Sequence, residues 1–79
     1  MSLDTGDDVM VDGLPYRVAC NHSGSVYLMA PGDPVDASHC TLIRAATEAE
    51  RLELLRALVG STWSNHRNVC ARARLEEMV

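Results

Sequence analysis

Lysine is absent from this chain of 79 residues, and all seven of its basic side chains are arginines. Long apolar runs are missing as well: stretches such as 26–30 are far shorter than the roughly 20 residues that a membrane-spanning helix requires. The glycines stand apart from one another, so they form no glycine-rich loop that could hold a phosphate. We therefore expect neither a membrane span nor a nucleotide-binding loop.

Cysteine is too rare to build a disulfide framework. The chain has three cysteines, widely spaced at Cys20, Cys40 and Cys70. An odd number with this spacing is typical of an intracellular protein whose thiols are reduced. The first ten residues carry three aspartates, where a secretory leader would have a basic and then an apolar segment. These two features predict a cytoplasmic location and free thiols.

The charge is distributed unevenly along the sequence. Residues 1–40 contain six aspartates and only Arg17 as a basic residue, whereas residues 41–79 contain six arginines and five glutamates. The net charge of −4 argues against a general nucleic-acid binder, because such proteins gain affinity by neutralising phosphates. Aromatic residues are limited to two tyrosines and Trp63, too few for the stacking surface of a single-strand binder. The acidic first half instead favours a basic protein partner.

The length of the chain allows one hydrophobic core. A domain of this size buries only about 60% of its unfolded surface, and its core supplies about 3–5 kcal/mol of net stability. Apolar residues make up 47% of the chain and charged residues 23%, which is typical of a folded protein. We predict a single domain spanning residues 1–79, which a partner, a metal or a second copy would stabilise further.

Strand-forming residues dominate three short segments of the first half. These segments cover about residues 9–11, 16–20 and 25–30. Asp12 with Gly13, and the segment 21–24, separate the three and have the composition of tight turns. Strict alternation along the second segment would place Cys20 on the same face as Val18. The first half therefore predicts an antiparallel meander.

A capping box marks the start of a helix in the second half. Thr47 is followed three residues later by Glu50, so that the hydroxyl and the carboxylate can each bind a backbone N–H group at the helix start. We predict a helix over about residues 48–59. Its apolar side chains cover more than half of the circumference, so we expect it to pack against the sheet and against a second surface.

A second helix is predicted to follow and to end near residue 77. Gly60 fits a left-handed cap at the end of the first helix, and the hydroxyl residues of 61–64 offer caps for the start of the second. The apolar face of this second helix is small. Its stability should therefore depend on contacts with the rest of the molecule or with a partner.

Together these elements predict an α+β fold. We expect an antiparallel meander of three or four strands over about residues 8–43, followed by a C-terminal hairpin of two helices over about 47–78. Residues 31–40 should form a loop, because two prolines prevent regular structure there. Residues 41–43 are either the fourth strand or the lead-in to the first helix.

The first hairpins resemble those that open small SH3-like barrels. The motifs that carry the resemblance are GDDVMVDG at 6–13, YRV at 16–18 and VYL at 26–28. The resemblance covers residues 6–30 and implies a sheet that closes into a barrel, although the helical second half departs from a plain barrel. A short, arginine-rich chain without catalytic motifs is also similar to accessory proteins of phages and plasmids. Neither likeness assigns a function to any residue.

Cysteines and histidines occur as neighbouring pairs. The pairs are Cys20 with His22, His39 with Cys40, and His66 with Cys70. Four such ligands would suffice for a structural zinc site, but buried cysteines and surface histidines explain the same pattern without a metal. Nothing marks an orienting acid or an oxyanion hole beside a Cys–His pair. We predict a protein that is not an enzyme and has no metal or cofactor, and the alternative is a zinc site of Cys20, His22, His66 and Cys70.

Two surfaces are candidates for binding a partner. Their residues are Trp63, Arg67 and Arg74 in the second helical region, and Asp7, Asp8 and Asp12 at one end of the sheet. Tryptophan and arginine are enriched in interface hot spots, and an acidic patch attracts a basic surface. We predict a small regulatory or inhibitory protein that acts by binding another protein or a second copy of itself. The alternative is a DNA-binding transcriptional regulator that uses the arginines of the second helix.

Overall fold

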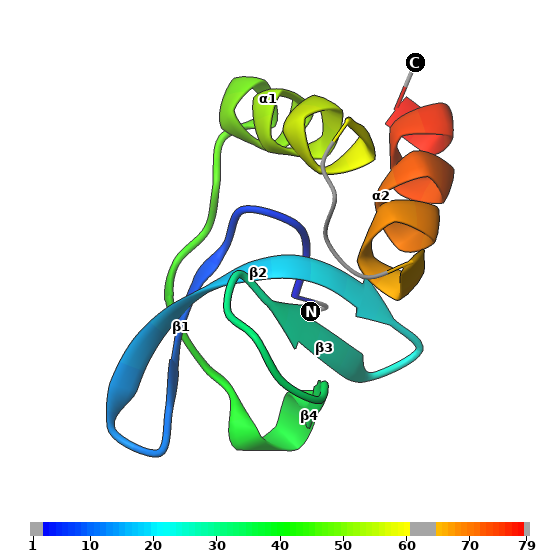
Figure 1. The fold of residues 1–79 in the computed structure, drawn as a ribbon. Coiled ribbons are helices and arrows are strands. Elements are labelled where there is room, and N and C mark those ends of the chain that lie inside the picture. Colours follow the sequence, from blue (N-terminus) through cyan, green and yellow to red (C-terminus); the bar gives the residue numbers. More distant parts are fainter. Residues whose placement is uncertain (1–2, 61–64, 79) are drawn as a thin grey trace.

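A computed structural model describes residues 3–60 and 65–78 of the chain. An antiparallel sheet of five strands is followed by two helices, which confirms the predicted α+β fold (Figure 1). The strands are β1 (Asp8–Val11), β2 (Leu14–His22), β3 (Ser25–Leu28), β4 (Val35–Asp36) and β5 (Thr41–Arg44). A 3-10 turn, η1 (Ala37–His39), precedes β5, and the helices are α1 (Glu48–Val59) and α2 (Asn65–Met78).

The strand order is β4-β3-β2-β1-β5, and every pairing is antiparallel. The first four strands therefore each pair with their neighbours in sequence. After η1 the chain returns to the far edge of the sheet, where β5 pairs with β1. The sheet has more strands than the three or four predicted. The additional strand is β4, which lies in the predicted loop 31–40 and has only two residues. A strand this short leaves no periodic pattern in a sequence.

Two tight turns connect the first three strands, as the sequence predicts. Asp12 and Gly13 have φ angles of 51° and 79°, and Ser23 and Gly24 have φ angles of 51° and 92°. Two successive residues with positive φ are the conformation that joins antiparallel strands with their natural twist. β2 extends to His22, so the second turn occupies only the last two residues of the segment 21–24.

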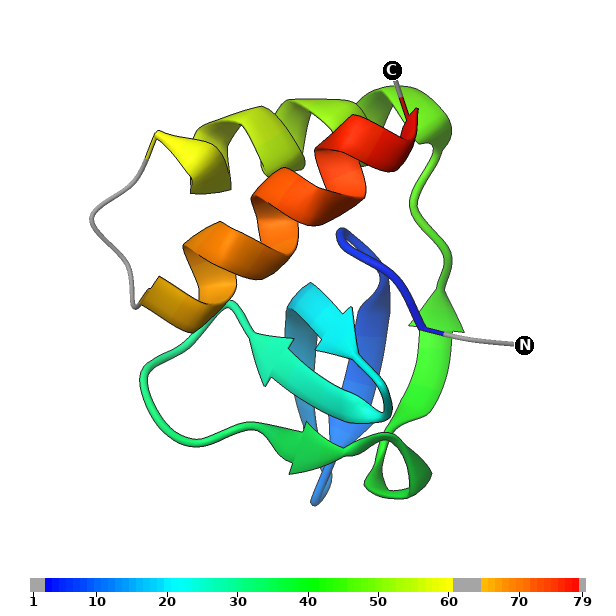
Figure 2. The same cartoon turned by 90° about the vertical axis from the view of Figure 1, so that its right-hand side faces the viewer.

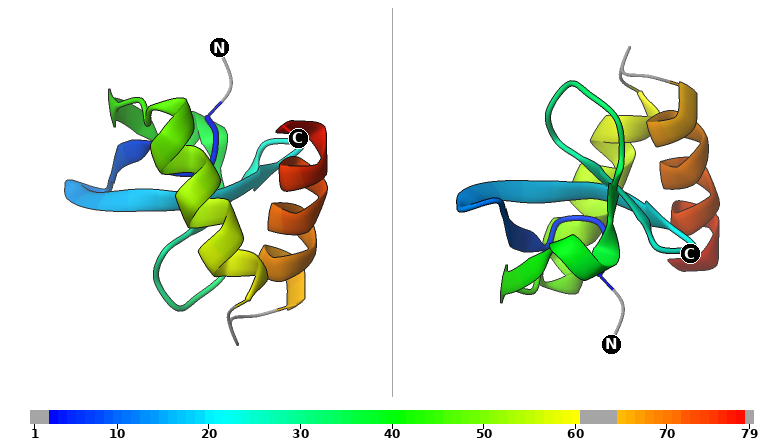
Figure 3. Two further views of the ribbon diagram at one scale, coloured as in Figure 1. Left: turned by 90° about the horizontal axis from the view of Figure 1, so that it is seen from above. Right: turned by 90° about the horizontal axis from the view of Figure 1, so that it is seen from below.

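The sheet curves around a core of its own. Its buried side chains come from the first three strands, and they are Val9, Val11, Val18, Val26 and Leu28. Tyr16 and Val35 pack against the edge of this cluster. Seen from below, β4, η1 and β5 lie beneath β2 (Figure 3). The β-branched residues of the hairpins thus fill the inside of the curved sheet.

The helices form a second layer on the outer face of the sheet. Figure 2 shows α1 and α2 side by side above the strands, and Figure 3 shows α1 crossing over β2. Ala19 of β2 is buried between them with Leu55 and Leu58 of α1 and Ala71 of α2. α1 therefore contacts both the sheet and α2, as its wide apolar face predicts.

The start of α1 is capped as predicted, but its end is not. The Thr47 hydroxyl accepts a hydrogen bond from the Glu50 amide at 3.2 Å, and the Glu50 carboxylate accepts one from the Thr47 amide at 2.9 Å. Gly60 has φ −88° and ψ 0°, which is right-handed, so the predicted left-handed cap is wrong. Its amide still reaches the Arg56 carbonyl at 3.3 Å, and this conformation does not require glycine.

Gly6 is the glycine that the fold needs most. Its φ is +92°, and a Cβ atom there would lie 2.9 Å from the Ala46 Cβ, whereas Gly13 has φ +79° and open space around it. We expect Gly6→Ala to lower the free energy of unfolding by about 2–3 kcal/mol, through backbone strain and a clash. Gly13→Ala should cost about 1 kcal/mol, through strain alone. Urea titrations of both variants check this, and equal losses would contradict the close contact at Gly6.

Candidate partner-binding groove

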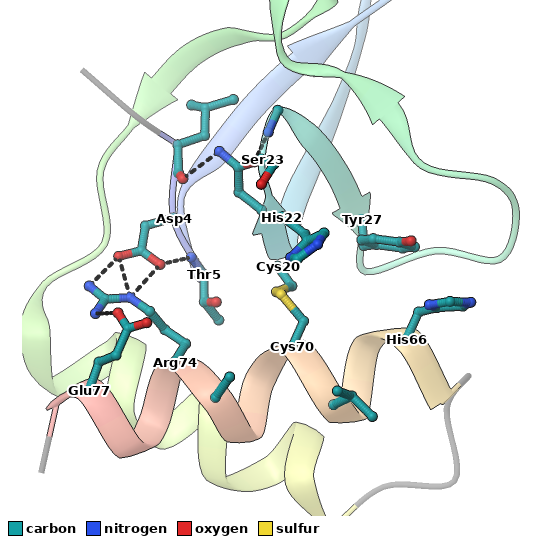
Figure 4. Close-up of a pocket in the computed structure, with 15 residues that line it drawn as sticks. Asp4, Thr5, Cys20, His22, Ser23, Tyr27, His66, Cys70, Arg74 and Glu77 are labelled. Atoms are coloured by element: carbon teal, nitrogen blue, oxygen red, sulfur yellow. Dashed lines mark hydrogen bonds and ion pairs between the residues drawn. A yellow bond between two sulfur atoms is a disulfide. The ribbon is translucent and has the colours of Figure 1, made fainter.

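A groove separates the β2–β3 hairpin from α2. Its volume is about 880 Å³, and Tyr27 lies on the hairpin side while Val69 and Ala73 lie on the helix side. Val69 is 68% exposed, a large fraction for an aliphatic side chain. In Figure 4 the Cys20–Cys70 disulfide joins the two walls near the middle of the groove. A groove with such apolar walls is suited to hold a side chain from another molecule.

An irregularity in β2 turns Cys20 toward the groove. The register between β2 and β3 shifts between Val18, which pairs with Leu28, and Cys20, which pairs with Tyr27. Because Leu28 faces the inner core and Tyr27 faces the helices, the shift moves Cys20 to the opposite face from Val18. The predicted alternation is therefore wrong at Cys20. The extra residue, Ala19, is buried under the helices.

The disulfide contradicts the prediction of reduced thiols for two of the three cysteines. Cys20 of β2 and Cys70 of α2 have Cα atoms 6.2 Å apart, within the range that a disulfide spans. The residues are 50 positions apart in sequence, so only the tertiary structure brings them together. Cys40 is a free thiol, and partial burial, followed by the negative charge of Asp36, raises its pKa.

One end of the groove is aromatic. The rings of Tyr27 and His66 are nearly parallel, with centroids 6.0 Å apart and an interplanar angle of 11°. His22, the last residue of β2, lines the groove beside Cys20 (Figure 4). These rings give a partner both flat apolar surface and nitrogen atoms that can form hydrogen bonds.

Arg67 supports this end from beneath the surface. It is only 5% exposed, and its guanidinium carbon lies 5.4 Å from the centre of the Tyr27 ring. Its Nε donates to the Leu28 carbonyl at 3.0 Å, and its Nη2 donates to the carbonyls of Ala30 at 2.9 Å and Gly32 at 3.3 Å. The side chain of Arg67 therefore fastens α2 to the end of β3 and the segment after it, and binding of a partner by Arg67 stays a prediction.

The opposite end of the groove is charged. Arg74 donates to Asp4 through Nη2 at 2.7 Å and through Nε at 3.1 Å, and its Nη1 lies 3.3 Å from the Glu77 carboxylate. Burial raises the pKa of Asp4, but hydrogen bonds from Arg74 and the Thr5 amide and the charge of Arg51 outweigh this, so the net pKa is lowered. The hydrogen bond with Asp4 raises the pKa of Arg74. Arg74 is thus paired with carboxylates of its own chain, and the predicted binding of a partner by Arg74 stays a prediction.

Asp7 is also part of the internal structure. Its side chain is 5% exposed, and Oδ1 accepts hydrogen bonds from Arg51 Nη2 and from the Ala46 amide, both at 2.9 Å. Its Oδ2 accepts one from the Asp4 amide at 3.0 Å. This carboxylate ties the N-terminal turn to the segment before α1. The structure gives Asp7 this internal role, and its part in an acidic binding patch stays a prediction.

The remaining candidates are divided between paired and exposed positions. The Asp8 carboxylate lies between two arginines. Its Oδ1 is 3.0 Å from Arg17 Nε, and its Oδ2 is 3.6 Å from Arg44 Nε. Asp12 is exposed in the β1–β2 turn. Trp63 lies outside the described residues. The acidic surface expected at one end of the sheet is therefore reduced, because the aspartates nearest the N-terminus are bound to arginines.

Sequence reasoning missed the groove itself. The pairing of cysteines with nearby histidines was the available signal, since Cys20, His22, His66 and Cys70 all line this groove. Within residues 3–60 and 65–78, no group of three or more histidine, cysteine or acidic side chains could hold a metal ion. The disulfide also removes the two thiolates that a zinc site would use. Over the same residues, no helix is long and apolar enough to cross a membrane.

The Glu50 carboxylate makes the free energy of unfolding depend on pH in the acidic range. Hydrogen bonds from Arg44 and from Thr47 lower the pKa of Glu50 to about 2. Because the pKa of Glu50 is lowered in the folded state, ionised Glu50 adds to the free energy of unfolding at pH values above its ordinary pKa. This contribution is lost as the pH falls toward 2. We expect Glu50→Gln to reduce the decline in stability between pH 5 and pH 2, measured by urea titration at each pH. Glu53→Gln on the same helix is the control, and identical declines in both variants would contradict this role.

No family model matches the chain, and no curated protein or solved structure matches it either. The likeness of residues 6–30 to SH3-like barrels therefore stays a prediction. The groove and the surface around it are therefore the features from which we infer a function.

Proposed function

We propose that this protein is a non-catalytic regulator or inhibitor that acts by binding another protein through the groove between the β2–β3 hairpin and α2. The observation that carries the proposal is the exposure of Val69 beside an apolar groove of about 880 Å³. A concave surface with apolar walls is the usual form of a binding site, and Val69 adds an exposed aliphatic side chain to this one. The cytoplasm is the proposed location.

The chemistry of the groove favours an apolar anchor from the partner. Tyr27, Val69 and Ala73 supply apolar walls, while His22, Ser23 and His66 supply polar groups around them. Interfaces are commonly built in this way, with a buried apolar side chain surrounded by polar contacts. We therefore propose that the partner inserts an aromatic or aliphatic side chain near Val69. A second copy of the chain is one protein that can supply such a side chain.

The groove is a better supported surface than the arginines of α2. A DNA-binding role would need cationic side chains that are free to meet phosphates or bases. Arg67 is bonded to backbone carbonyls, and Arg74 is bonded to Asp4 and Glu77. These bonds weaken the case for the DNA-binding alternative, because breaking the Arg67 bonds would leave the buried Leu28 carbonyl without its donor. Of the three arginines of α2, only Arg72 is exposed.

Val69→Asp tests the proposal, with Leu14→Asp as the matched control. Leu14 is 57% exposed but lies in the β1–β2 hairpin, outside the groove. A protein captured by the unchanged chain should bind Val69→Asp roughly thirtyfold more weakly, which corresponds to the loss of one interface hot spot. It should bind Leu14→Asp normally. Affinities from calorimetry and oligomeric states from light scattering provide the readout, and equal effects of the two substitutions would contradict the proposal.

A further inference from the structure

The Cys20–Cys70 disulfide lies at the groove surface instead of deep inside the core. Both cysteines line the groove, but they differ in exposure. Cys20 is 2% exposed, whereas Cys70 is partly exposed on the side of α2 that faces the hairpin. Thiol–disulfide exchange requires a thiolate to reach one of the two sulfur atoms. The difference in burial favours attack on Cys70, with Cys20 as the leaving thiolate.

Two histidines accompany the disulfide in the groove. His22 follows Cys20 by two residues and therefore shares its strand face, and His66 precedes Cys70 by one helical turn. Both imidazoles are exposed and line the groove (Figure 4). The groove therefore combines an accessible disulfide with an imidazole on each of its two walls.

α2 has other attachments that do not depend on the disulfide. Arg67 bonds to the carbonyls of Leu28 and Ala30, Arg74 bonds to Asp4, and Ala71 is buried against α1. These contacts lie on both sides of Cys70 along the helix. The disulfide can thus open while the helix remains in place.

From these observations we infer that Cys20–Cys70 is an exchange-active disulfide that a dithiol reduces through the groove of the folded protein. One thiolate of the dithiol attacks Cys70 Sγ, the bond between the two cysteines breaks, and Cys20 leaves as a thiolate. The second thiolate of the dithiol then attacks its own sulfur in the mixed disulfide and releases Cys70. Two electrons and two protons pass to the protein, and the dithiol becomes a disulfide. This exchange does not depend on the partner-binding role proposed above.

Reduction kinetics of the complete oxidised chain test this inference. Cys40 is first blocked with iodoacetamide, and dithiothreitol is added at several concentrations without denaturant. Samples are quenched with N-ethylmaleimide, and mass spectrometry counts the thiols released. The rate should rise in proportion to dithiothreitol concentration while circular dichroism still reports a folded protein. A rate that is independent of dithiothreitol concentration would overturn the inference, since reduction would then wait for unfolding.

The site of attack is tested with glutathione, a monothiol that leaves a mixed disulfide. Peptide mapping after rapid quenching should find glutathione on Cys70 at least about fivefold more often than on Cys20, because only Cys70 is accessible. The same reaction in denaturant is the control and should label both cysteines to similar extents. Equal labelling in the folded protein, or a preference for Cys20, would contradict attack through the groove.

Discussion

Arg67→Met is expected to lower the free energy of unfolding by about 3 kcal/mol, because hydrogen bonds from a buried cation to several carbonyls are lost. The Leu28 carbonyl is the buried acceptor, whereas the carbonyls of Ala30 and Gly32 lie in a more exposed segment that water can reach. The loss of unfolding free energy should therefore be smaller than the sum of the contributions of the individual hydrogen bonds. Urea titration should show a midpoint lower by about 2 M.

Arg72→Met is the matched control, since Arg72 is an exposed arginine on the same helix. It should change the midpoint only slightly. Arg67→Lys keeps the charge but loses the planar group that reaches several carbonyls at once, so its loss should be intermediate. A midpoint for Arg67→Met equal to that of Arg72→Met would show that Arg67 does not fasten α2 to the segment after β3.

Removal of the disulfide is the second large change. The double substitution Cys20→Ala with Cys70→Ala should lower the free energy of unfolding by up to about 4 kcal/mol, from the loop-closure entropy of a 50-residue separation. The core of a domain of this size supplies about 3–5 kcal/mol without the disulfide. The variant should remain folded but show a much lower midpoint in urea than the oxidised protein.

Cys40→Ala is the control for this experiment, because Cys40 is a free thiol. It directly precedes the edge strand β5, whereas Cys20 lies in the central strand β2. The Cys40→Ala substitution should leave the midpoint nearly unchanged. A double variant as stable as the oxidised protein would mean that the constraint between β2 and α2 contributes nothing. Loss of stability in Cys40→Ala alone would point to a different role for the third cysteine.

The sequence predicts those parts of the fold that local chemistry determines. Thr47 and Glu50 identify the start of α1, because their capping interactions lie within one turn of chain. Asp12 with Gly13 identifies the first hairpin, because few other residues accept two successive positive φ angles. Both features depend only on neighbours within a few residues, and both predictions are confirmed.

Apart from the cap at Gly60, the parts that failed depend on distant residues. The shift at Ala19 has no sequence signal, and it alone reverses the face on which Cys20 lies. Asp7 and Arg67 look like free surface charges in the sequence, yet Arg51 and the carbonyls after β3 bind them across long separations. The groove likewise lies between segments that are far apart in sequence, the β2–β3 hairpin and α2. Its position could therefore not be predicted, although the Cys–His pairs that line it were visible.

Amide chemical shifts test directly whether a partner binds in the groove between the β2–β3 hairpin and α2. They are compared before and after a partner protein, or excess unlabelled chain, is added to ¹⁵N-labelled protein. We expect the largest changes around His22, Tyr27, Val69 and Ala73, which line the groove. Changes concentrated at the β1–β2 turn or along β5, with none in the groove, would contradict it.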